Sequence, residues 1–541
     1  MINRRRFIGY TILGGAGLAA GPAGCGRAGD TETESEAGNP ATAPFELDEA
    51  TVADLQEGME SGRWTARSIT ELYLSRIEAL DRQGPELRSI IETNPQALEI
   101  ADQLDAERAA GGTRGPLHGI PVTIKDNIDT ADQMTTTAGS LALEGSIPAE
   151  DSFVAGKLRA AGAIILAKAN LSEWANFRSN DSSSGWSGRG GQCRNPYALD
   201  RNPCGSSSGS GSAVSSNLTA LAIGTETDGS VVCPSTRMGI VGIKPTVGLV
   251  GRSGIIPIAH NQDTAGPMVR TVRDGAILLG ALAGIDPRDG MTGASDGNSQ
   301  ADYTQSLDAA GLEGARLGVA RNFPFRDDVV SLFDEATAAV KDAGATIIDP
   351  ADVPNLDKYG DSEFEVLLYE FKADLNSYLE SLGPGARVKS LAEIIEFNEQ
   401  NREREMPFFG QDILIAAQEK GPLTDPAYLD ALANGHRYSR REGIDQVMDE
   451  HNLDAIIAPT GGPAWMTDHV NGDTGTGFSS RPAAVSGYPS ITVPMGFVSG
   501  LPIGISFFGR AWTEPVLLKF AYAFEQSTKH RQAPKFLQTV G

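Results

Sequence analysis

The fold of this chain is decided by a stretch near its middle, residues 203–246, which contains the segments PCGSSSGSGS (203–212), GTETDGS (224–230) and GIVGIKPT (239–246). The stretch is crowded with Gly and Ser and carries few charges. A flexible Gly/Ser linker has no reason to contain the apolar runs 218–223 and 241–245, so this stretch is no linker. Small residues let the backbone approach a ligand closely, and serine hydroxyls can take part in chemistry.

Apolar segments with the spacing of strands and helices alternate on both sides of this stretch. The patterns predict strands at 120–124, 163–167, 316–320, 346–348, 454–458, 490–494 and 503–508, and helices at 52–59, 69–80, 97–110, 153–161, 213–222, 328–343 and 364–382. Asp48 or Thr51 is expected to cap the first helix. This alternation predicts an α/β fold with a largely buried sheet. No boundary separates Phe45 from Gly541, so we expect one large domain there.

Composition limits the classes of partner and site. The chain has 541 residues and a net charge of −25, which argues against nucleic acid or an anionic membrane surface as a partner. The four cysteines form no CxxC pair and the six histidines no HExxH motif, so we expect neither a metal site nor a cofactor. Cys204 and Cys233 flank the Ser-rich segments. They form a disulfide in an oxidising compartment or stay buried free thiols, and we favour free thiols.

The first 25 residues have the pattern of an export signal. Arg4 and Arg5 precede Phe7 and a short apolar run, which is similar to a twin-arginine signal. The segment AGC (23–25) resembles a lipoprotein cleavage site that would place a lipid on Cys25, although Pro22 replaces the usual Leu. A plain signal peptide is the alternative. Residues 26–44 are expected to form a disordered tether. We therefore expect an exported protein, periplasmic or anchored to the membrane only through that lipid.

Three residues in these segments could carry chemistry. A serine such as Ser206 or Ser230 is a weak nucleophile that needs a base, and no His lies near either in sequence. Lys125 ends an apolar run, and burial there could lower its pKa from about 10.4 to roughly 7–8, where an amine can act as a base. Taken singly, each has a plainer interpretation: Lys125 as a solvent-facing strand end, Ser230 as a helix N-cap, and Ser206 as a loop residue.

Together, the segments resemble the amidase signature family. The similar motifs are GIPVTIKD (119–126), AKANLSE (167–173), RNPY (194–197), the Ser-rich run from 203, GTETDGS (224–230), GIKPT (242–246) and YPSITVP (488–494). The resemblance extends from about Phe45 to the C-terminal end. It implies a catalytic domain at 45–541, built as a central mixed, mostly parallel twisted sheet with helices on both faces. It also implies a hydrolase of linear amide bonds that needs no metal or cofactor.

The resemblance also implies roles for individual residues. Ser230 would attack the amide carbonyl, while Ser206, held by a cis peptide bond after Gly205, would pass the proton to neutral Lys125. The backbone N–H groups of residues Thr227, Asp228, Gly229 and Ser230 would form the oxyanion hole. Gly205, Ser207 and Thr225 would support the site. Lys168, Lys244 and Arg201 also lie in matching motifs, and we interpret them as structural.

Departures from the commonest family pattern indicate a subgroup. Cys204, Asp228 and Cys233 together are similar to the bacterial peptide amidases, which release ammonia from C-terminally amidated peptides. Asp228 either orients the leaving nitrogen or is a structural hydrogen-bonding residue in its loop. The expected substrate is a small-molecule or peptide amide, with water as the second reactant. Two alternatives remain: an exported lipoprotein that binds amides without turnover, and an amidotransferase glutaminase subunit, which an export signal would keep far from tRNA.

Overall fold

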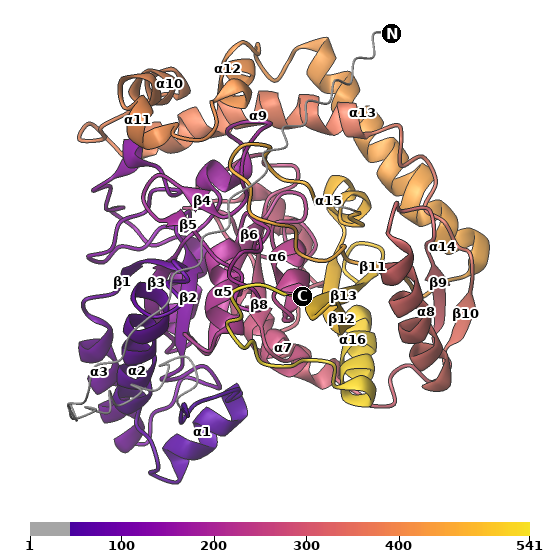
Figure 1. The fold of residues 1–541 in the computed structure, drawn as a ribbon, viewed down its shortest axis with the longest axis horizontal. Helices are drawn as coiled ribbons and strands as arrows, with labels where there is room; N and C mark the ends of the chain where they lie inside the picture. The colour runs from indigo at the N-terminus through magenta and orange to yellow at the C-terminus, as the bar shows by residue number, and fades with distance from the viewer. Residues whose placement is uncertain (1–43, 476, 541) are drawn as a thin grey trace, which may run out of the picture. The chain divides into compact units, whose positions relative to one another are not determined.

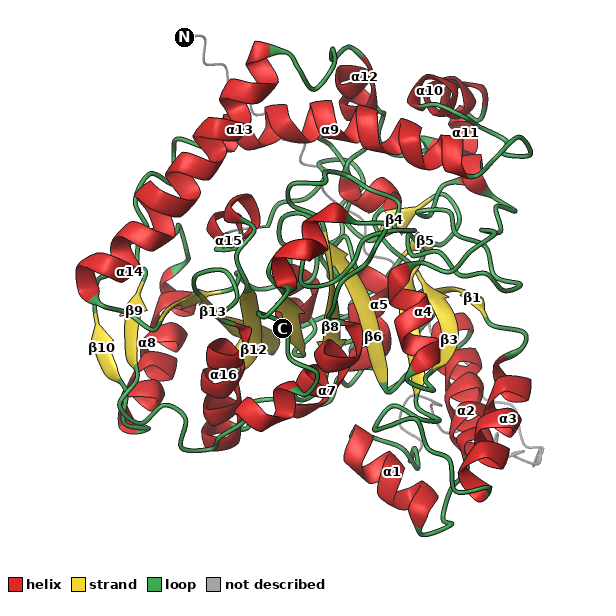
Figure 2. Cartoon of the chain, turned by 180° about the vertical axis from the view of Figure 1, so that it is seen from behind, coloured by secondary structure: helices red, strands yellow, loops and turns green. Residues whose placement is uncertain are grey.

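A mixed sheet of eleven strands runs through the protein, as the computed structural model shows for residues 44–475 and 477–540 (Figures 1 and 2). In spatial order the strands are β1 (Ile90–Thr93), β3 (Ile164–Ala169), β2 (Pro121–Lys125), β6 (Leu221–Glu226), β8 (Thr264–Val269), β7 (Val241–Lys244), β12 (Ser490–Val498), β13 (Leu501–Phe508), β11 (Ala455–Pro459), β9 (Arg316–Val319) and β10 (Thr346–Ile348). The export signal with Cys25, and the tether up to residue 43, lie outside the described residues.

The expectation of a mostly parallel sheet is wrong. Strands β3, β2 and β6 run parallel, as do β11, β9 and β10, but every neighbouring pair from β6 through β8, β7, β12 and β13 to β11 is antiparallel, and so is β1 with β3. The sequence patterns did not single out β7 and β8 as strands, and the short turn at Ser499 and Gly500 joins β12 to β13 as a hairpin. Such a hairpin connects antiparallel strands only.

Helices surround the sheet and form a further layer away from it. They are α1 (Val52–Glu60), α2 (Ala66–Arg76), α3 (Ala97–Ala109), α4 (Phe153–Ala160), α5 (Ser208–Ser215), α6 (Val232–Arg237), α7 (Val272–Leu282), α8 (Asp327–Asp342), α9 (Gly360–Ser381), α10 (Leu391–Gln400), α11 (Arg402–Glu405), α12 (Asp412–Gln418), α13 (Pro426–Ser439), α14 (Asp445–His451), α15 (Arg481–Ser486) and α16 (Glu514–Thr528). None of the helices in the described ranges is long and apolar enough to cross a membrane.

Both faces of the sheet are covered by helices, as the resemblance implied. Successive side chains of a strand point to opposite faces. Along β6, Leu221 and Ile223 belong to the large apolar cluster that includes α7, α8 and α16. Ala222, between them, packs with Val214 of α5 in a separate cluster. The described chain is thus a single large α/β domain with a two-sided core.

A separate helical layer lies over the loops that follow the strands. Helices α9, α10 and α12 share an apolar cluster with Leu171, Trp174, Ile256 and Ile258, which all lie outside the sheet. In Figure 1 this layer is the orange band along the edge of the molecule, with α9 as its longest helix. Because Ile256 and Ile258 are buried in this cluster, the helical layer packs on the segment that carries them.

One predicted helix is wrong. The expectation of a helix at 213–222 is replaced by α5, which begins earlier at Ser208, and by β6 from Leu221. The small residues at 208–212 have poor intrinsic helix propensity, yet they allow a fully buried helix, so tertiary packing overrides propensity here. The other predicted elements lie within a few residues of their expected bounds, and Thr51 rather than Asp48 caps α1.

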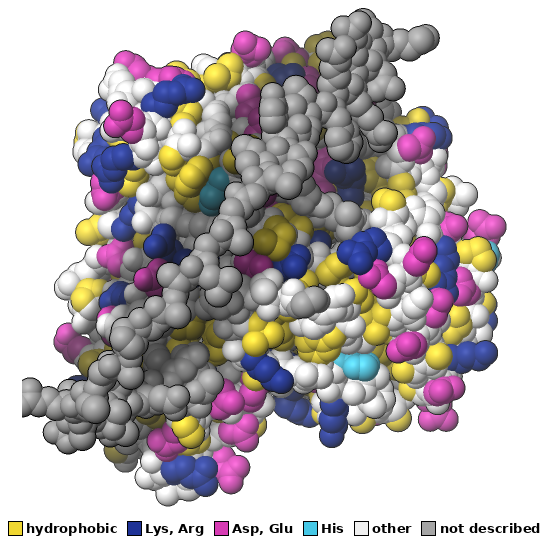
Figure 3. Space-filling model, viewed as in Figure 1, with side chains coloured by type: hydrophobic (Ala, Val, Ile, Leu, Met, Phe, Trp, Pro, Cys, Tyr) yellow, Lys and Arg dark blue, Asp and Glu magenta, His cyan; other side chains and the backbone are white. Residues whose placement is uncertain are grey.

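The surface carries charges of both signs. On the uncovered part of the face in Figure 3, Asp and Glu side chains are interspersed with Lys and Arg side chains. Apolar side chains lie among them. This view therefore contains no single-sign field among the described residues that would steer a polyanion to it.

Candidate active site

Lys125 is the last residue of β2 and lies inside the protein. Strand β2 has parallel neighbours on both sides, and the Lys125 side chain is fully buried. Its Nζ donates to Ser206 Oγ at 2.7 Å, to Thr225 Oγ1 at 2.8 Å and to the Thr225 carbonyl at 3.2 Å. Burial lowers the pKa of Lys125 to about 7, against the opposing charges of Asp263 and Glu226. A large fraction of this amine is neutral near pH 7 and can accept a proton.

Ser206 approaches Lys125 from the Gly/Ser-rich loop before α5. The peptide bond between Gly205 and Ser206 is cis, as the resemblance implied. Ser206 is fully buried, and its carbonyl accepts from the Ser172 N–H at 3.1 Å. A Cβ atom on residue 205 would lie 2.2 Å from Ser172 Oγ, so this close approach of two loops requires Gly205.

Ser207 and Thr225 join the loop of Ser206 to the loop of Ser230. Ser207 N–H donates to the Ser230 carbonyl at 3.2 Å, and Ser207 Oγ donates to the Thr225 carbonyl at 3.1 Å. Thr225 N–H donates back to Ser207 Oγ at 3.2 Å. These bonds bring the two serine loops side by side over the end of β2. The residues predicted to support the site therefore contact it directly.

The loop of residues 227–230, which we call the oxyanion loop, connects β6 to α6. The Glu226 carboxylate accepts from the Val231 N–H at 2.7 Å and the Val232 N–H at 2.9 Å, which closes the turn. Gly229 has φ +79°, a conformation that favours glycine. Within the described chain, none of the four backbone N–H groups of the oxyanion loop donates to a protein acceptor. Unpaired N–H groups in such a loop can stabilise an oxyanion.

Ser230 is the one predicted catalytic side chain without a direct bond to the others. Lys125 and Ser206 are hydrogen-bonded, but among the described residues no hydrogen bond joins Ser206 Oγ to Ser230 Oγ. Ser230 is 7 % exposed, whereas Ser206 and Lys125 are fully buried. Catalytic hydrogen bonds are often long without substrate and tighten when it binds. The most exposed of the three hydroxyl and amine groups is thus the one placed to meet a substrate.

Cys204 and Cys233 form a disulfide, so the expectation of free thiols at these positions is wrong. Their Cα atoms are 6.1 Å apart although 29 residues separate them in sequence. The hydrogen bonds between the serine loops bring the two cysteines together, and sequence separation carries no information about that distance. Cys193 is a buried free cysteine. The disulfide packs on Trp465.

Asp228 is held within the oxyanion loop by two neighbours. Ser480 Oγ donates to Asp228 Oδ1 at 2.6 Å, and Arg481 Nε lies 3.7 Å from Asp228 Oδ2. These contacts support the structural interpretation of Asp228. The same residue lines a cavity beside the site.

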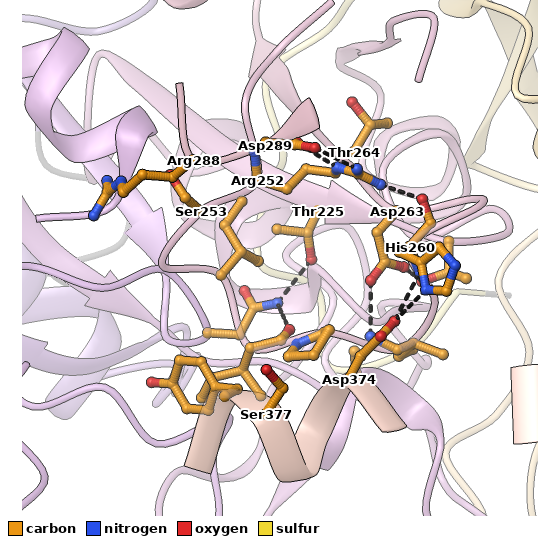
Figure 4. Close-up of a pocket in the computed structure, with 18 residues that line it drawn as sticks. Thr225, Arg252, Ser253, His260, Asp263, Thr264, Arg288, Asp289, Asp374 and Ser377 are labelled. Atoms are coloured by element: carbon orange, nitrogen blue, oxygen red, sulfur yellow. Dashed lines mark hydrogen bonds and ion pairs between the residues drawn. The ribbon is translucent and has the colours of Figure 1, made fainter. Parts of the chain in front are cut away.

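Two cavities reach the site. The larger, of roughly 680 Å³, contacts Gly205 and Gly229, the residues just before Ser206 and Ser230. Its walls include the disulfide and the aromatic residues Phe323, Trp465 and Phe478. The smaller, of roughly 310 Å³, reaches Thr225 and Thr227 (Figure 4). The larger cavity falls in the usual volume range of ligand pockets and is mostly apolar with a few polar groups, as such pockets usually are.

The other basic residues of the matching motifs make structural contacts. Lys168 is fully buried and donates to the Ile128 carbonyl at 2.6 Å and Thr136 Oγ1 at 2.7 Å. Lys244 donates to the Tyr488 carbonyl at 2.7 Å, and burial lowers its pKa to about 8. Arg201 Nε lies 3.5 Å from Asp200 Oδ1. None of the three contacts Ser206 or Ser230 among the described residues.

Sequence reasoning missed several residues around the site. Asn127 donates to Thr225 Oγ1 at 3.0 Å, and Gln262 and Asp263 bond to Thr227. Asn127 lies two residues after Lys125, so its proximity was a usable signal. Gln262 and Asp263 directly precede β8, and only the antiparallel pairing of β8 with β6 brings them to the oxyanion loop. That pairing was not expected.

A sequence model described as Amidase matches residues 68–518. The chain belongs to the amidase signature family. An Arabidopsis thaliana protein described as a probable amidase is 42% identical over 502 residues, covering 91% of this chain and 93% of that protein. A glutamyl-tRNA(Gln) amidotransferase subunit of Moorella thermoacetica is 32% identical over 502 residues, covering 91% of this chain and 99% of that protein.

Solved structures of amidases share this fold. The native peptide amidase from Stenotrophomonas maltophilia superposes with a TM-score of 0.88 at 50% identity, covering 91% of this chain and 100% of that one. A peptide amidase in complex with the competitive inhibitor chymostatin gives a TM-score of 0.87 at 49% identity, with the same coverage. The chain is therefore an amidase-family enzyme that acts on amide bonds, and its fold is that of the peptide amidases.

Proposed function

We propose that this enzyme releases ammonia from the C-terminal carboxamide of peptides by a Ser-Ser-Lys mechanism. The observation that carries the proposal is the buried Lys125–Ser206 hydrogen bond beside an oxyanion loop with unpaired N–H groups. A buried amine in contact with a serine hydroxyl provides the base that a serine nucleophile needs. Among the described residues, no histidine is hydrogen-bonded to Lys125, Ser206 or Ser230.

The proposed reaction proceeds in two halves. Ser230 Oγ attacks the carbonyl carbon while its proton passes to Ser206 Oγ, and the Ser206 proton passes to Lys125 Nζ. The N–H groups of the oxyanion loop bind the negative oxygen of the tetrahedral intermediate. The proton returns along the same path to the leaving nitrogen, and ammonia departs. Water then attacks the acyl-enzyme by the reverse route and releases the carboxylic acid.

The peptide substrate class rests on the larger cavity and on the relatives. A volume of roughly 680 Å³ with aromatic walls suits a short peptide better than a small aliphatic amide. Identity to the peptide amidase, at 50%, exceeds the 32% identity to the amidotransferase subunit over similar lengths. Both facts favour a peptide amide over glutamine as the substrate.

The test is ammonia release from an amidated dipeptide, an aliphatic amide and glutamine, with Ser230→Ala as the control enzyme. We expect release from the dipeptide amide at the highest kcat/KM and none with Ser230→Ala. Release from the aliphatic amide alone would remove the peptide specificity but keep the chemistry. Release by Ser230→Ala at the parent rate would overturn the mechanism, and no release from any amide would favour a binding protein.

We also propose that the protein is exported. The paired Arg4 and Arg5 and the cleavage-site pattern before Cys25 support export, and the Cys204–Cys233 disulfide supports an oxidising compartment. Fractionation of cells that produce the full chain tests this proposal. Replacing both arginines with lysine should leave the protein in the cytosol, and Cys25→Ser should move an anchored form into the soluble fraction. An unchanged location in both variants would contradict it.

A further inference from the structure

Four consecutive residues, His260 to Asp263, lie between helix α9 and the oxyanion loop and are hydrogen-bonded to both. We call them the link segment. The antiparallel register places Thr264 of β8 opposite Glu226 of β6, so the link segment enters β8 where the oxyanion loop leaves β6. In Figure 4 His260 and Asp263 extend from one side of the smaller cavity, and His260 faces Asp374 of α9. The segment thus contacts two elements that are far apart in sequence.

The far side of the link segment binds one acidic face of α9. Glu363, Glu370 and Asp374 have the spacings of seven and four residues that place side chains on one face of a helix. His260 Nδ1 lies 2.8 Å from Asp374 Oδ2, and Asn261 N–H donates to Glu370 Oε2 at 3.0 Å. Gln262 Nε2 donates to Glu363 Oε1 at 3.1 Å.

The carboxylates of this face are occupied by hydrogen bonds. Glu370 is fully buried and also accepts from Tyr428 OH at 2.8 Å. His260, Glu370 and Asp374 offer ligand-type atoms within 4.8 Å of one another, but the hydrogen bonds of the link segment already account for that proximity. The arrangement is therefore an anchor for the link segment on α9.

The near side of the link segment holds Thr227, the first residue of the oxyanion loop. Thr227 Oγ1 donates to Asp263 Oδ1 at 2.5 Å, and Gln262 Nε2 donates to the Thr227 carbonyl at 3.3 Å. Asp263 Oδ2 accepts from the Ile258 N–H at 2.8 Å and the Ala259 N–H at 2.9 Å, which fixes the carboxylate itself. The side-chain hydroxyl and the carbonyl of Thr227 are therefore both hydrogen-bonded, whereas its N–H is not.

The oxyanion loop is held from its other side as well. Ser480 and Arg481 contact Asp228, and Arg481 Nε lies 2.9 Å from Glu363 Oε2. Glu363 thus connects both supports, because its other oxygen accepts from Gln262. Within the loop, the N–H groups are left unpaired, while the side chains of Thr227 and Asp228 and the carbonyls of residues 227, 229 and 230 are hydrogen-bonded to neighbours.

We propose that Gln262 and Asp263 are positioning residues that fix Thr227 so that the N–H groups of the oxyanion loop face the carbonyl oxygen of the substrate. The proposal rests on the proposed function, because only an enzyme that forms an oxyanion uses this loop. In the described part of the chain, neither side chain is hydrogen-bonded to Lys125, Ser206 or Ser230. Electrostatic stabilisation of an oxyanion depends on donors held in place before the reaction, so loosening Thr227 weakens transition-state binding more than substrate binding.

The kinetic test compares Asp263→Ala, Asp263→Asn and Gln262→Met with Asp289→Asn. Asp289 lines the same cavity but pairs with Arg252, so it controls for loss of a negative charge there. On an amidated dipeptide we expect kcat of Asp263→Ala to fall about 10-fold to 100-fold, with KM within about twofold. Asp263→Asn, which keeps one acceptor oxygen, should recover part of that loss. Gln262→Met should lose several-fold in kcat, and Asp289→Asn less than about threefold.

A second measurement needs no substrate. The N–H groups of Val231, Val232 and Cys233 are hydrogen-bonded and close the oxyanion loop, so their amide exchange reports on its opening. We expect at least about tenfold faster exchange in Asp263→Ala and parent-like exchange in Asp289→Asn. Equal exchange in both, or equal changes in kcat and KM, would overturn the positioning role. If the parent hydrolyses no amide, the proposed function fails. The exchange rates then still show whether Asp263 holds the oxyanion loop in place.

Discussion

Lys125 and Lys168 lie at the ends of neighbouring parallel strands and differ only in what surrounds their amines. Both side chains are fully buried, and burial lowers the pKa of both. Lys125 bonds to a serine hydroxyl next to the oxyanion loop, whereas Lys168 bonds to a carbonyl and a threonine, with Asp126 and Asp129 nearby. Burial at a strand end therefore does not by itself make a base. In the proposed mechanism, the hydrogen bond to Ser206 beside the loop of Ser230 makes Lys125 the base.

The two lysines should differ most in their effect on kcat/KM when each is replaced with an apolar side chain of similar length. Lys125→Met should lower kcat/KM about 100-fold to 10,000-fold, because the base is removed. Lys168→Met should keep kcat/KM within about tenfold but lose roughly 3 kcal/mol of unfolding free energy, because two buried acceptors lose their donor. Amide hydrolysis and urea unfolding check both. Equal losses of activity would contradict the assignment.

The next effect comes from the serine that Lys125 contacts. Ser206→Ala should lower kcat/KM by about 100-fold or more, because the relay between Ser230 and Lys125 is cut. Ser210 is the matched control, since it is buried in the same Ser-rich run and donates only to the Ile223 carbonyl at 3.0 Å. Ser210→Ala should cost about 1 kcal/mol of stability with little change in kcat/KM. A full-rate Ser206→Ala enzyme would exclude the relay.

A smaller effect is expected from the Cys204–Cys233 disulfide, which lies beside the Lys125 site and not beside Lys168. The Cys204→Ser, Cys233→Ser double variant should lose about 3–4 kcal/mol of unfolding free energy, the loop-closure value for a separation of this length. Its kcat/KM should fall several-fold because the two serine loops lose a covalent tie. Urea unfolding of the parent with and without reductant gives the same comparison. Cys193→Ala, measured beside it, should show the same response to reductant as the parent.

The smallest effect is a shift in the pH profile. The charge of Asp263 raises the pKa of Lys125, so Asp263→Asn should move the acid limb of kcat/KM to lower pH, by less than about one unit. Asp129→Asn removes a charge near Lys168 and should leave the limb in place. A shift to higher pH in Asp263→Asn would contradict the assignment of the limb to Lys125.

The comparison of the two lysines also shows which features of the site and the fold could be predicted from the sequence. The ordered motifs predicted Lys125, Ser206 and Ser230 as the catalytic residues, and the structure places the first two in a hydrogen bond. Motif order and residue type can be read from the sequence without any knowledge of distance. The same reasoning mistook the sheet for mostly parallel and placed a helix over Leu221 and Ala222, because short apolar runs do not distinguish a buried strand from a buried helix.

What the sequence could not supply was contact between distant segments. The Cys204–Cys233 bond and the bonds from Asp263 to Thr227 depend on strand pairing that no local pattern specifies. The bonds between the link segment and the acidic face of α9 also join residues more than 100 positions apart in the sequence. Local propensity predicts elements, and the partners of buried polar groups follow only from the assembled sheet.

The central claim is that neutral Lys125 is the base, and the pH profile of kcat/KM tests it most directly. A group that must be unprotonated makes activity fall as pH drops below its pKa, here about 7, by about tenfold per pH unit. Between about pH 5 and pH 9 the parent and Lys168→Met should share this acid limb, and the residual activity of Lys125→Met should lack it. A limb near pH 7 that persists in Lys125→Met would contradict the account.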